Sequence, residues 1–234
     1  MISTLLSGMP HIHLVGWLND EVITPYLKND SFEYQTHDDG GLTELINKHI
    51  TCKLPDDKKM CKTVKDLQTH AHSKSCHKKG KDCRFDFPKM PSNKTIISKP
   101  IDQTSEEEKR ELSEANAIKK QMKDYIGSDE FDENLSLEEI LTKLKIPSKD
   151  YERALRLSDR GSQIVLKRSP KECYINNYNE NFLKSWQANM DLQFCTDVYA
   201  VVTYICDYYS KDETGMTEFL KNTLKDAKNL GQKD

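Results

Sequence analysis

The sequence predicts an α+β protein in which a small antiparallel sheet is accompanied by a metal-binding loop and a group of helices. Apolar, partly β-branched stretches at 8–18 and 162–168 predict strands. Between them, cysteines and histidines gather in 51–95, and helix-start signals recur in 101–160. We therefore divide the 234 residues into an N-terminal strand segment (1–50), a Cys/His segment (51–100), a helical insertion (101–160) and a C-terminal segment (161–234).

Composition excludes several classes of protein. Charged residues make up 31% and hydrophobic residues 36%, which leaves enough apolar side chains for a core. No run of about 18 apolar residues occurs, so we expect no membrane span. The start, MISTLLSGMP, lacks the basic region of a secretory signal, and the seven cysteines are an odd number. We expect an intracellular protein with reduced thiols.

The first strand carries a metal-binding pattern, Pro10-His11-Ile12-His13. Alternation along a strand places His11 and His13 on one face, roughly 6–7 Å apart at the backbone. Two imidazoles so placed can share one divalent ion. An isolated pattern of this kind is also typical of two ordinary histidines near a strand end.

The Cys/His segment offers a second set of metal ligands. The spacing His-x-His-x3-Cys-x6-Cys selects His70, His72, Cys76 and Cys83, and two imidazoles with two thiolates form a tetrahedral zinc set. Cys52, Cys61 and His77 are alternative ligands. The competing interpretation is a basic loop with incidental thiols.

Charge is distributed unevenly along the chain, whose net charge is only −3. Residues 51–95 contain 12 Lys and Arg against 5 Asp and Glu, whereas 101–160 contain 11 against 16. The basic stretch predicts contacts with a phosphate backbone, and the candidate DNA-binding residues are Lys74, Lys78, Lys79 and Arg84.

The acidic insertion contains three predicted helices. Ser105 with Glu108 and Ser136 with Glu139 have capping-box spacing, and Pro147 ends the second helix. Ser148 is expected to cap the third. We expect these helices to be mostly solvated and to lie outside the sheet.

Two tyrosines near the C-terminus are candidate nucleophiles. Tyr204 and Tyr208 are four residues apart, which places both phenols on one face of a helix, and Lys211 follows at three residues. A phenol has a pKa near 10, so it needs a nearby metal ion or base to attack a phosphodiester at neutral pH. The alternative is a buried aromatic stripe that includes Tyr199 and Tyr209.

Four blocks taken in order resemble the Rep-type nuclease of Helitron transposons, the Helitron helicase-like domain. They are PHIHLVGWL, LQTHAHSKSCHKKGKDCRFDFP, IVLKRSPKECYINNYNENFLKSWQANMDLQF and YICDYYSKDETGM. The resemblance covers most of the chain, so residues 1–50 would be the N-terminal part of the nuclease, with the His-x-His strand, and 161–234 its C-terminal part, with the two-tyrosine helix.

The resemblance implies a nuclease that nicks and joins single-stranded DNA, as in rolling-circle replication. A tyrosine would attack the phosphodiester and stay bound to the 5′ phosphate. The motifs assign a magnesium or manganese ion to His11 and His13, and the attack to Tyr204 and Tyr208, with Lys211 neutralising phosphate charge. A nuclear location is expected if the source is eukaryotic.

The sequence also departs from the family pattern. The residues before His11 offer no carboxylate or amide as a third metal ligand, which leaves Asp191, Gln193 and Asp207 as candidates. The family's helicase region is missing, and no G-x4-GK[ST] loop occurs, so no ATP-driven motor is expected in this chain. We therefore expect a truncated piece with weak nicking, and the alternative is a non-catalytic nucleic-acid-binding remnant.

Overall fold

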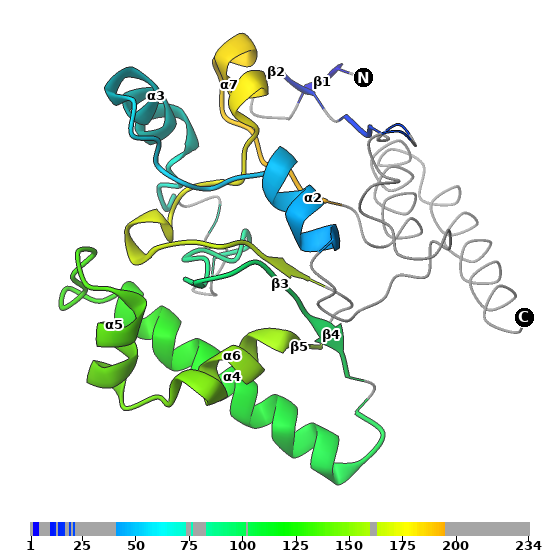
Figure 1. The fold of residues 1–234 in the computed structure, drawn as a ribbon, viewed down its shortest axis with the longest axis vertical. Helices are drawn as coiled ribbons and strands as arrows, with labels where there is room; N and C mark the ends of the chain where they lie inside the picture. The colour runs from blue at the N-terminus through cyan, green and yellow to red at the C-terminus, as the bar shows by residue number, and fades with distance from the viewer. Residues whose placement is uncertain are drawn as a thin grey trace, which may run out of the picture.

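The computed structural model (Figure 1) describes most of the middle of the chain. The described residues are 2–4, 10–12, 14–16, 19, 21, 41–73, 76, 83–101, 103–159 and 163–194. The helices are α2 (Gly41–His49), α3 (Lys58–Gln68), α4 (Glu106–Ile126), α5 (Leu137–Leu144), α6 (Ser148–Arg156) and α7 (Glu180–Trp186), with a 3-10 turn at Pro170–Glu172. The strands are β1 (Ile2–Thr4), β2 (Pro10–Ile12), β3 (Ile96–Ile97), β4 (Lys99–Pro100), β5 (Leu157–Ser158) and β6 (Ile164–Val165).

The mixed helix and strand content that the sequence predicts is present, but the strands are short. β1 pairs with β2 and β3 with β6 in antiparallel fashion, whereas β4 and β5 run parallel. The apolar stretch 162–168 contributes only Ile164–Val165 to a strand. The described strands therefore form separate two-stranded pairs instead of one antiparallel sheet.

The capping signals of the acidic insertion are confirmed. Ser105 and Glu108 form a complete capping box at the start of α4, and Ser136 and Glu139 form another at the start of α5. The prediction for the third helix is wrong in detail, since α6 begins at Ser148 itself and its N-cap is Pro147, which has no side chain able to accept a hydrogen bond.

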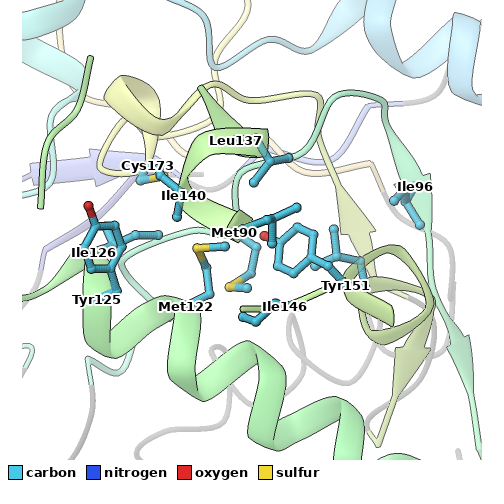
Figure 2. Close-up of a cluster of buried hydrophobic side chains, with 12 residues drawn as sticks. Met90, Ile96, Met122, Tyr125, Ile126, Leu137, Ile140, Ile146, Tyr151 and Cys173 are labelled. Atoms are coloured by element: carbon cyan, nitrogen blue, oxygen red, sulfur yellow. The ribbon is translucent and has the colours of Figure 1, made fainter. Parts of the chain in front are cut away.

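The three helices do not form a mostly solvated insertion, because they surround the largest buried apolar cluster. Figure 2 shows Met122 and Tyr125 of α4, Ile140 of α5 and Tyr151 of α6 as members of this cluster. Side chains from outside the insertion join them, namely Met90, Ile96 and Cys173. The phenol of Tyr151 donates a hydrogen bond to the carbonyl of Pro91, at 2.8 Å. The insertion is thus anchored to the Cys/His segment by burial.

A single irregular segment, 168–178, joins the other parts of the chain. It forms isolated backbone bridges with Thr51, Thr69 and Ser92, which belong to three separate stretches. The buried guanidinium of Arg168 holds the segment in its curve, since it donates to the carbonyl of Ile175 at 2.7 Å, to the carbonyl of Glu172 and to Oδ1 of Asn177 at 3.0 Å. These bonds satisfy carbonyls that no regular strand partner reaches.

Two further apolar clusters lie in the described core, apart from a small one formed by Cys76, Cys83 and Phe87. Ile46 of α2 and Ile50, which follows this helix, pack with Leu166 and Cys52 beside the β3–β6 pair. The second cluster joins α3 to α7 through Met60, Val64, Ile175, Tyr178 and Leu183. No described helix combines the length and the apolar character needed to cross a membrane.

Candidate metal centre

Four predicted zinc ligands come together where α3 ends. Thr69 closes the helix with extended backbone angles, so the chain leaves α3 in a straight path that carries His70 and His72. Cys76 follows in a turn in which its backbone N–H donates to the carbonyl of Ser73, at 3.1 Å. Cys83 begins a second turn, closed by a bond from the N–H of Asp86 to the Cys83 carbonyl, at 2.8 Å.

The four ligand atoms lie close enough together to share one metal ion. The nitrogen and sulfur atoms of His70, His72, Cys76 and Cys83 all lie within 4.8 Å of one another. Cys76 Sγ lies 3.6 Å from His72 Nδ1, and Cys83 Sγ lies 3.4 Å from His70 Nε2. Zinc with bonds of about 2.3 Å to sulfur and about 2.0–2.1 Å to nitrogen separates its ligand atoms by roughly 3.3–3.8 Å. The two closest pairs already have this separation, and the group as a whole could hold one metal ion.

The sulfur ligands are shielded from solvent and supported by hydrogen bonds. Cys76 is 1% exposed, and Cys83 is also buried. The backbone N–H of Ser73 donates to Cys76 Sγ at 3.1 Å. Burial acts to raise the pKa of the Cys76 thiol, but hydrogen bonds from Ser73 and Cys83 outweigh it and lower that pKa. A lowered pKa favours the thiolate, which is the form that binds metal.

Aromatic rings surround the histidine side of the centre. The ring of Phe87 stacks on His70 with centroids 4.3 Å apart and planes 7° from parallel. Tyr174 meets the edge of His72 at 5.8 Å and lies parallel to Phe87 at 6.5 Å. Such packing restricts the ring planes of both imidazoles, while His70 stays half-buried and His72 exposed.

Backbone bonds connect the centre to the segment 168–178. The N–H of His70 donates to the carbonyl of Tyr174 at 2.7 Å, and the N–H of Lys89 donates to the carbonyl of Cys173 at 2.8 Å. The N–H of Arg84 donates to the carbonyl of Cys76 at 3.0 Å, which closes the loop between the two cysteines. The second and third sequence blocks therefore meet at the metal centre.

The alternative cysteine ligands lie outside this group. The thiol of Cys52 is buried beside Leu166 and hydrogen bonds to the carbonyl of Lys167, at 3.4 Å. Burial raises the pKa of Cys52 to about 11. Cys61 is half-buried on α3, and His77 lies outside the described residues.

The remaining predicted site residues are only partly described. Among the DNA-binding candidates, Arg84 is exposed and its guanidinium lies 4.4 Å from the ring centroid of Phe85. The backbone of His11 lies in β2 and pairs with Ser3. His13, Lys74, Lys78, Lys79, Tyr204, Tyr208 and Lys211 lie outside the described residues.

Two candidates for the third nuclease ligand are described, at the end of the third block. Asp191 and Gln193 are both exposed, and Gln193 Nε2 donates to Asp191 Oδ2 at 2.9 Å. Asp207 and His13 lie outside the described residues. The proximity of Asp191, Gln193 or Asp207 to the His11–His13 pair therefore stays a prediction. A separate shallow cleft of about 360 Å³, lined by residues 47–51 and 179–181, contains none of the predicted site residues.

Sequence reasoning identified the four ligands but not their supports. The place of Phe87 beside the ligands could have been predicted, because it is only four residues after Cys83 in the CRFDFP stretch. The place of Tyr174 could not have been predicted in this way, since it is far from the ligands in sequence. It reaches them only because the segment held by Arg168 curves back toward them.

Comparison of this chain with protein-family models, with curated proteins and with solved structures finds no match.

Proposed function

We propose that this chain is part of a Rep-type DNA-nicking domain of the Helitron kind and that a zinc ion stabilises its Cys/His segment. The observation that supports this most directly is the four-ligand centre. Its members are the Cys and His residues of the second resembling block, and their ligand atoms lie within 4.8 Å of one another. The centre also contacts Tyr174 of the third block, so residues of two of the four blocks take part in the same site.

The zinc ion has a structural role in this proposal. A catalytic zinc keeps one position open for water or substrate, whereas a structural zinc has four protein ligands. Here the thiolates and imidazoles supply all four, and the thiolate side is buried. Zinc also suits this ligand set better than magnesium or manganese, which prefer oxygen ligands.

The nicking chemistry is assigned to residues outside the metal centre. One of Tyr204 and Tyr208 loses its phenol proton to solvent and attacks the phosphorus through the phenol oxygen. The bond from phosphorus to the 3′ oxygen breaks, and the 3′ oxygen takes up a proton from solvent. The tyrosine then carries the 5′ phosphate. His11 and His13 would hold a magnesium or manganese ion, which stabilises the developing negative charge when bound.

The proposal is tested by incubating the zinc-loaded chain with end-labelled single-stranded DNA and manganese. We expect a covalent protein–DNA adduct on denaturing electrophoresis. The double substitution Tyr204→Phe/Tyr208→Phe removes only two hydroxyls and should abolish the adduct while DNA binding persists. Tyr174→Phe is the matched control, since it removes a phenol at the metal centre, and it should leave the adduct in place.

Two results would contradict parts of the proposal. An adduct that survives the double tyrosine substitution would reject the mechanism. DNA binding without any adduct in manganese would favour the alternative, a non-catalytic DNA-binding remnant.

A further inference from the structure

Helix α3 has one apolar face and one lysine face. Met60, Val64 and Gln68, spaced at four residues, are buried. Lys58, Lys62 and Lys65 recur at four and three residues, so they form a stripe on the other side of the helix, about 10 Å long. All three lysines are exposed, as is Lys59 beside them.

This stripe carries net positive charge. Within the described part of the chain, none of these lysines forms a salt bridge, in contrast to Lys109 of α4 and Lys184 of α7, which pair with Glu106 and Glu180. Asp66 is also exposed on this helix, but the four lysines leave the solvent side of α3 with an excess of positive charge, which attracts a polyanion.

The neighbouring helix α7 presents two large aromatic rings to solvent. Phe182 is 61% exposed and Trp186 is 52% exposed. The two residues are four apart, which places them on one face of the helix. Between them, Leu183 is fully buried, so the helix is anchored while its aromatic face remains open. Two adjacent exposed rings of this size are unusual on a surface that has no partner.

One apolar cluster fixes both helices. Leu183 of α7 packs with Met60 and Val64 of α3, together with Tyr178 and Ile175. Figure 1 shows the two helices adjacent to each other, apart from α4 to α6. The lysine stripe and the aromatic pair therefore belong to one packed unit.

We infer that the α3–α7 unit binds single-stranded DNA, with the lysines of α3 contacting phosphates and Phe182 and Trp186 stacking on unpaired bases. Sites for single strands combine a basic surface that follows the backbone with aromatic side chains that stack on bases. A duplex keeps its bases stacked inside and would use only the lysines. The choice of DNA over other polyanions rests on the proposed nicking function, but the binding surface itself involves neither the tyrosines nor the metal centre.

The test is fluorescence anisotropy with a labelled 20-nucleotide oligo-dT, using the zinc-loaded full chain with Tyr204→Phe/Tyr208→Phe so that no covalent adduct forms. We expect Phe182→Ala/Trp186→Ala to weaken binding roughly ten- to a hundred-fold, because each stacked base contributes substantially. Phe182→Tyr/Trp186→Tyr, which keeps two stacking rings, should restore most of the affinity. Because both side chains are exposed, the melting temperature should change little.

The lysine stripe is tested through the salt dependence of binding. Lys58→Gln/Lys62→Gln/Lys65→Gln should reduce the slope of log affinity against log salt by about 2, since each phosphate contact to a single strand contributes about 0.7. The control, Lys109→Gln/Lys120→Gln/Lys149→Gln, removes the same charge from exposed positions in α4 and α6 and should leave the slope nearly unchanged.

The outcomes separate this inference from the proposed function. Unchanged oligo-dT affinity in both the aromatic and the lysine variants would overturn the inference, even if the unsubstituted chain forms its covalent adduct. Binding of a duplex or of heparin as tight as that of oligo-dT, with no effect of the aromatic substitutions, would also overturn it. Loss of oligo-dT binding in both variants, with no adduct from the unsubstituted chain, would support the inference and reject the nicking function.

Discussion

Two regions of this protein reach a folded state by different means. The helical module, residues 103–159, consists of three helices, two of which start with capping boxes, around one apolar cluster. The metal-centred region, residues 41–101 and 163–194, has short helices and paired strands of only two residues, and irregular segments bridge its parts. Besides small apolar clusters, this region contains the group of four metal ligands.

The comparison shows where each region obtains its stability. In the helical module, local hydrogen bonds start the helices and the buried side chains hold them together. In the metal-centred region the connections run between distant stretches, such as Thr51 with Tyr178 and Thr69 with Ile175. Each such bridge must offset the entropy of closing a long loop. A bound ion that joins residues 70–83 lowers that cost, so we expect the two regions to respond differently to metal.

The largest expected effect comes from removing the metal. Chelation, or Cys76→Ser, should remove a contribution on the order of 10 kcal/mol, as found for structural zinc in small domains. Amide hydrogen exchange should then become fast in 58–92 and 168–178 but stay slow in α4. Metal analysis of the purified protein should give one zinc per chain.

Cys61→Ser provides the matched control for the ligand substitutions. Cys61 is a half-buried thiol that is not part of the ligand group, so its removal should leave zinc content and exchange rates nearly unchanged. Equal loss of protection in both regions after chelation would show that they fold as one unit.

The second effect concerns the core of the helical module. Ile140→Ala removes a fully buried side chain from the cluster shown in Figure 2 and should cost about 2–5 kcal/mol of unfolding free energy. Zinc content should be unaffected. Thr142→Ala, an exposed position on the same helix, should change stability by less than about 0.5 kcal/mol. Loss of zinc in Ile140→Ala would mean that the module supports the metal centre.

Interactions between residues close in sequence could be predicted in both regions, whereas contacts between distant segments could not. The capping boxes of Ser105 and Ser136 are interactions over three residues, so the sequence contains both partners side by side. The His70 to Cys83 ligand set is also local, and its chemistry is recognisable from spacing. The role of Arg168 was not predictable from the sequence. The carbonyls of Glu172 and Ile175 come within reach of its guanidinium only once the chain has curved around it.

The burial of the helical module was also beyond the sequence pattern. Its acidic composition predicts a solvated insertion, but charge describes only the outer faces of α4 to α6. The inner faces pack against Met90, Ile96 and Cys173 from other segments. The sequence alone does not show which residues of distant segments will meet.

The third effect is a loss of stability at alkaline pH, caused by two buried thiols of the metal-centred region. Burial raises the pKa of Cys52 to about 11 and that of Cys173 to about 12, from an ordinary value of 9.0. The folded state therefore holds these protons more tightly than the unfolded chain does. The stabilisation is complete below pH 9 and is lost as pH rises through 11–12, at about 1.4 kcal/mol per pH unit for each thiol.

Chemical denaturation of zinc-loaded protein at pH 8, 9 and 10 measures this slope. Cys52→Ala/Cys173→Ala should flatten it between pH 9 and 10. Val64→Ala, which creates a cavity without removing an ionisable group, should lower stability and keep the original slope. An unchanged slope in the double cysteine variant would assign the alkaline loss to other groups, such as Tyr151, whose pKa burial also raises.

The smallest expected effect concerns one of the ion pairs that join the two regions. Lys123 of α4 pairs with Asp86, in the turn that follows Cys83, and their side chains are 30% and 69% exposed. A pair this open to solvent contributes about 0–1 kcal/mol, and less as salt increases. Asp86 adopts a left-handed backbone angle φ of 62°, which asparagine tolerates, so Asp86→Asn removes the charge without straining the turn.

A double-mutant cycle of Lys123→Gln with Asp86→Asn should give a coupling energy below about 1 kcal/mol and an unchanged zinc affinity. A tenfold fall in zinc affinity in Lys123→Gln would show that α4 helps to hold the ligand loop, and the two regions would then have to be treated as one.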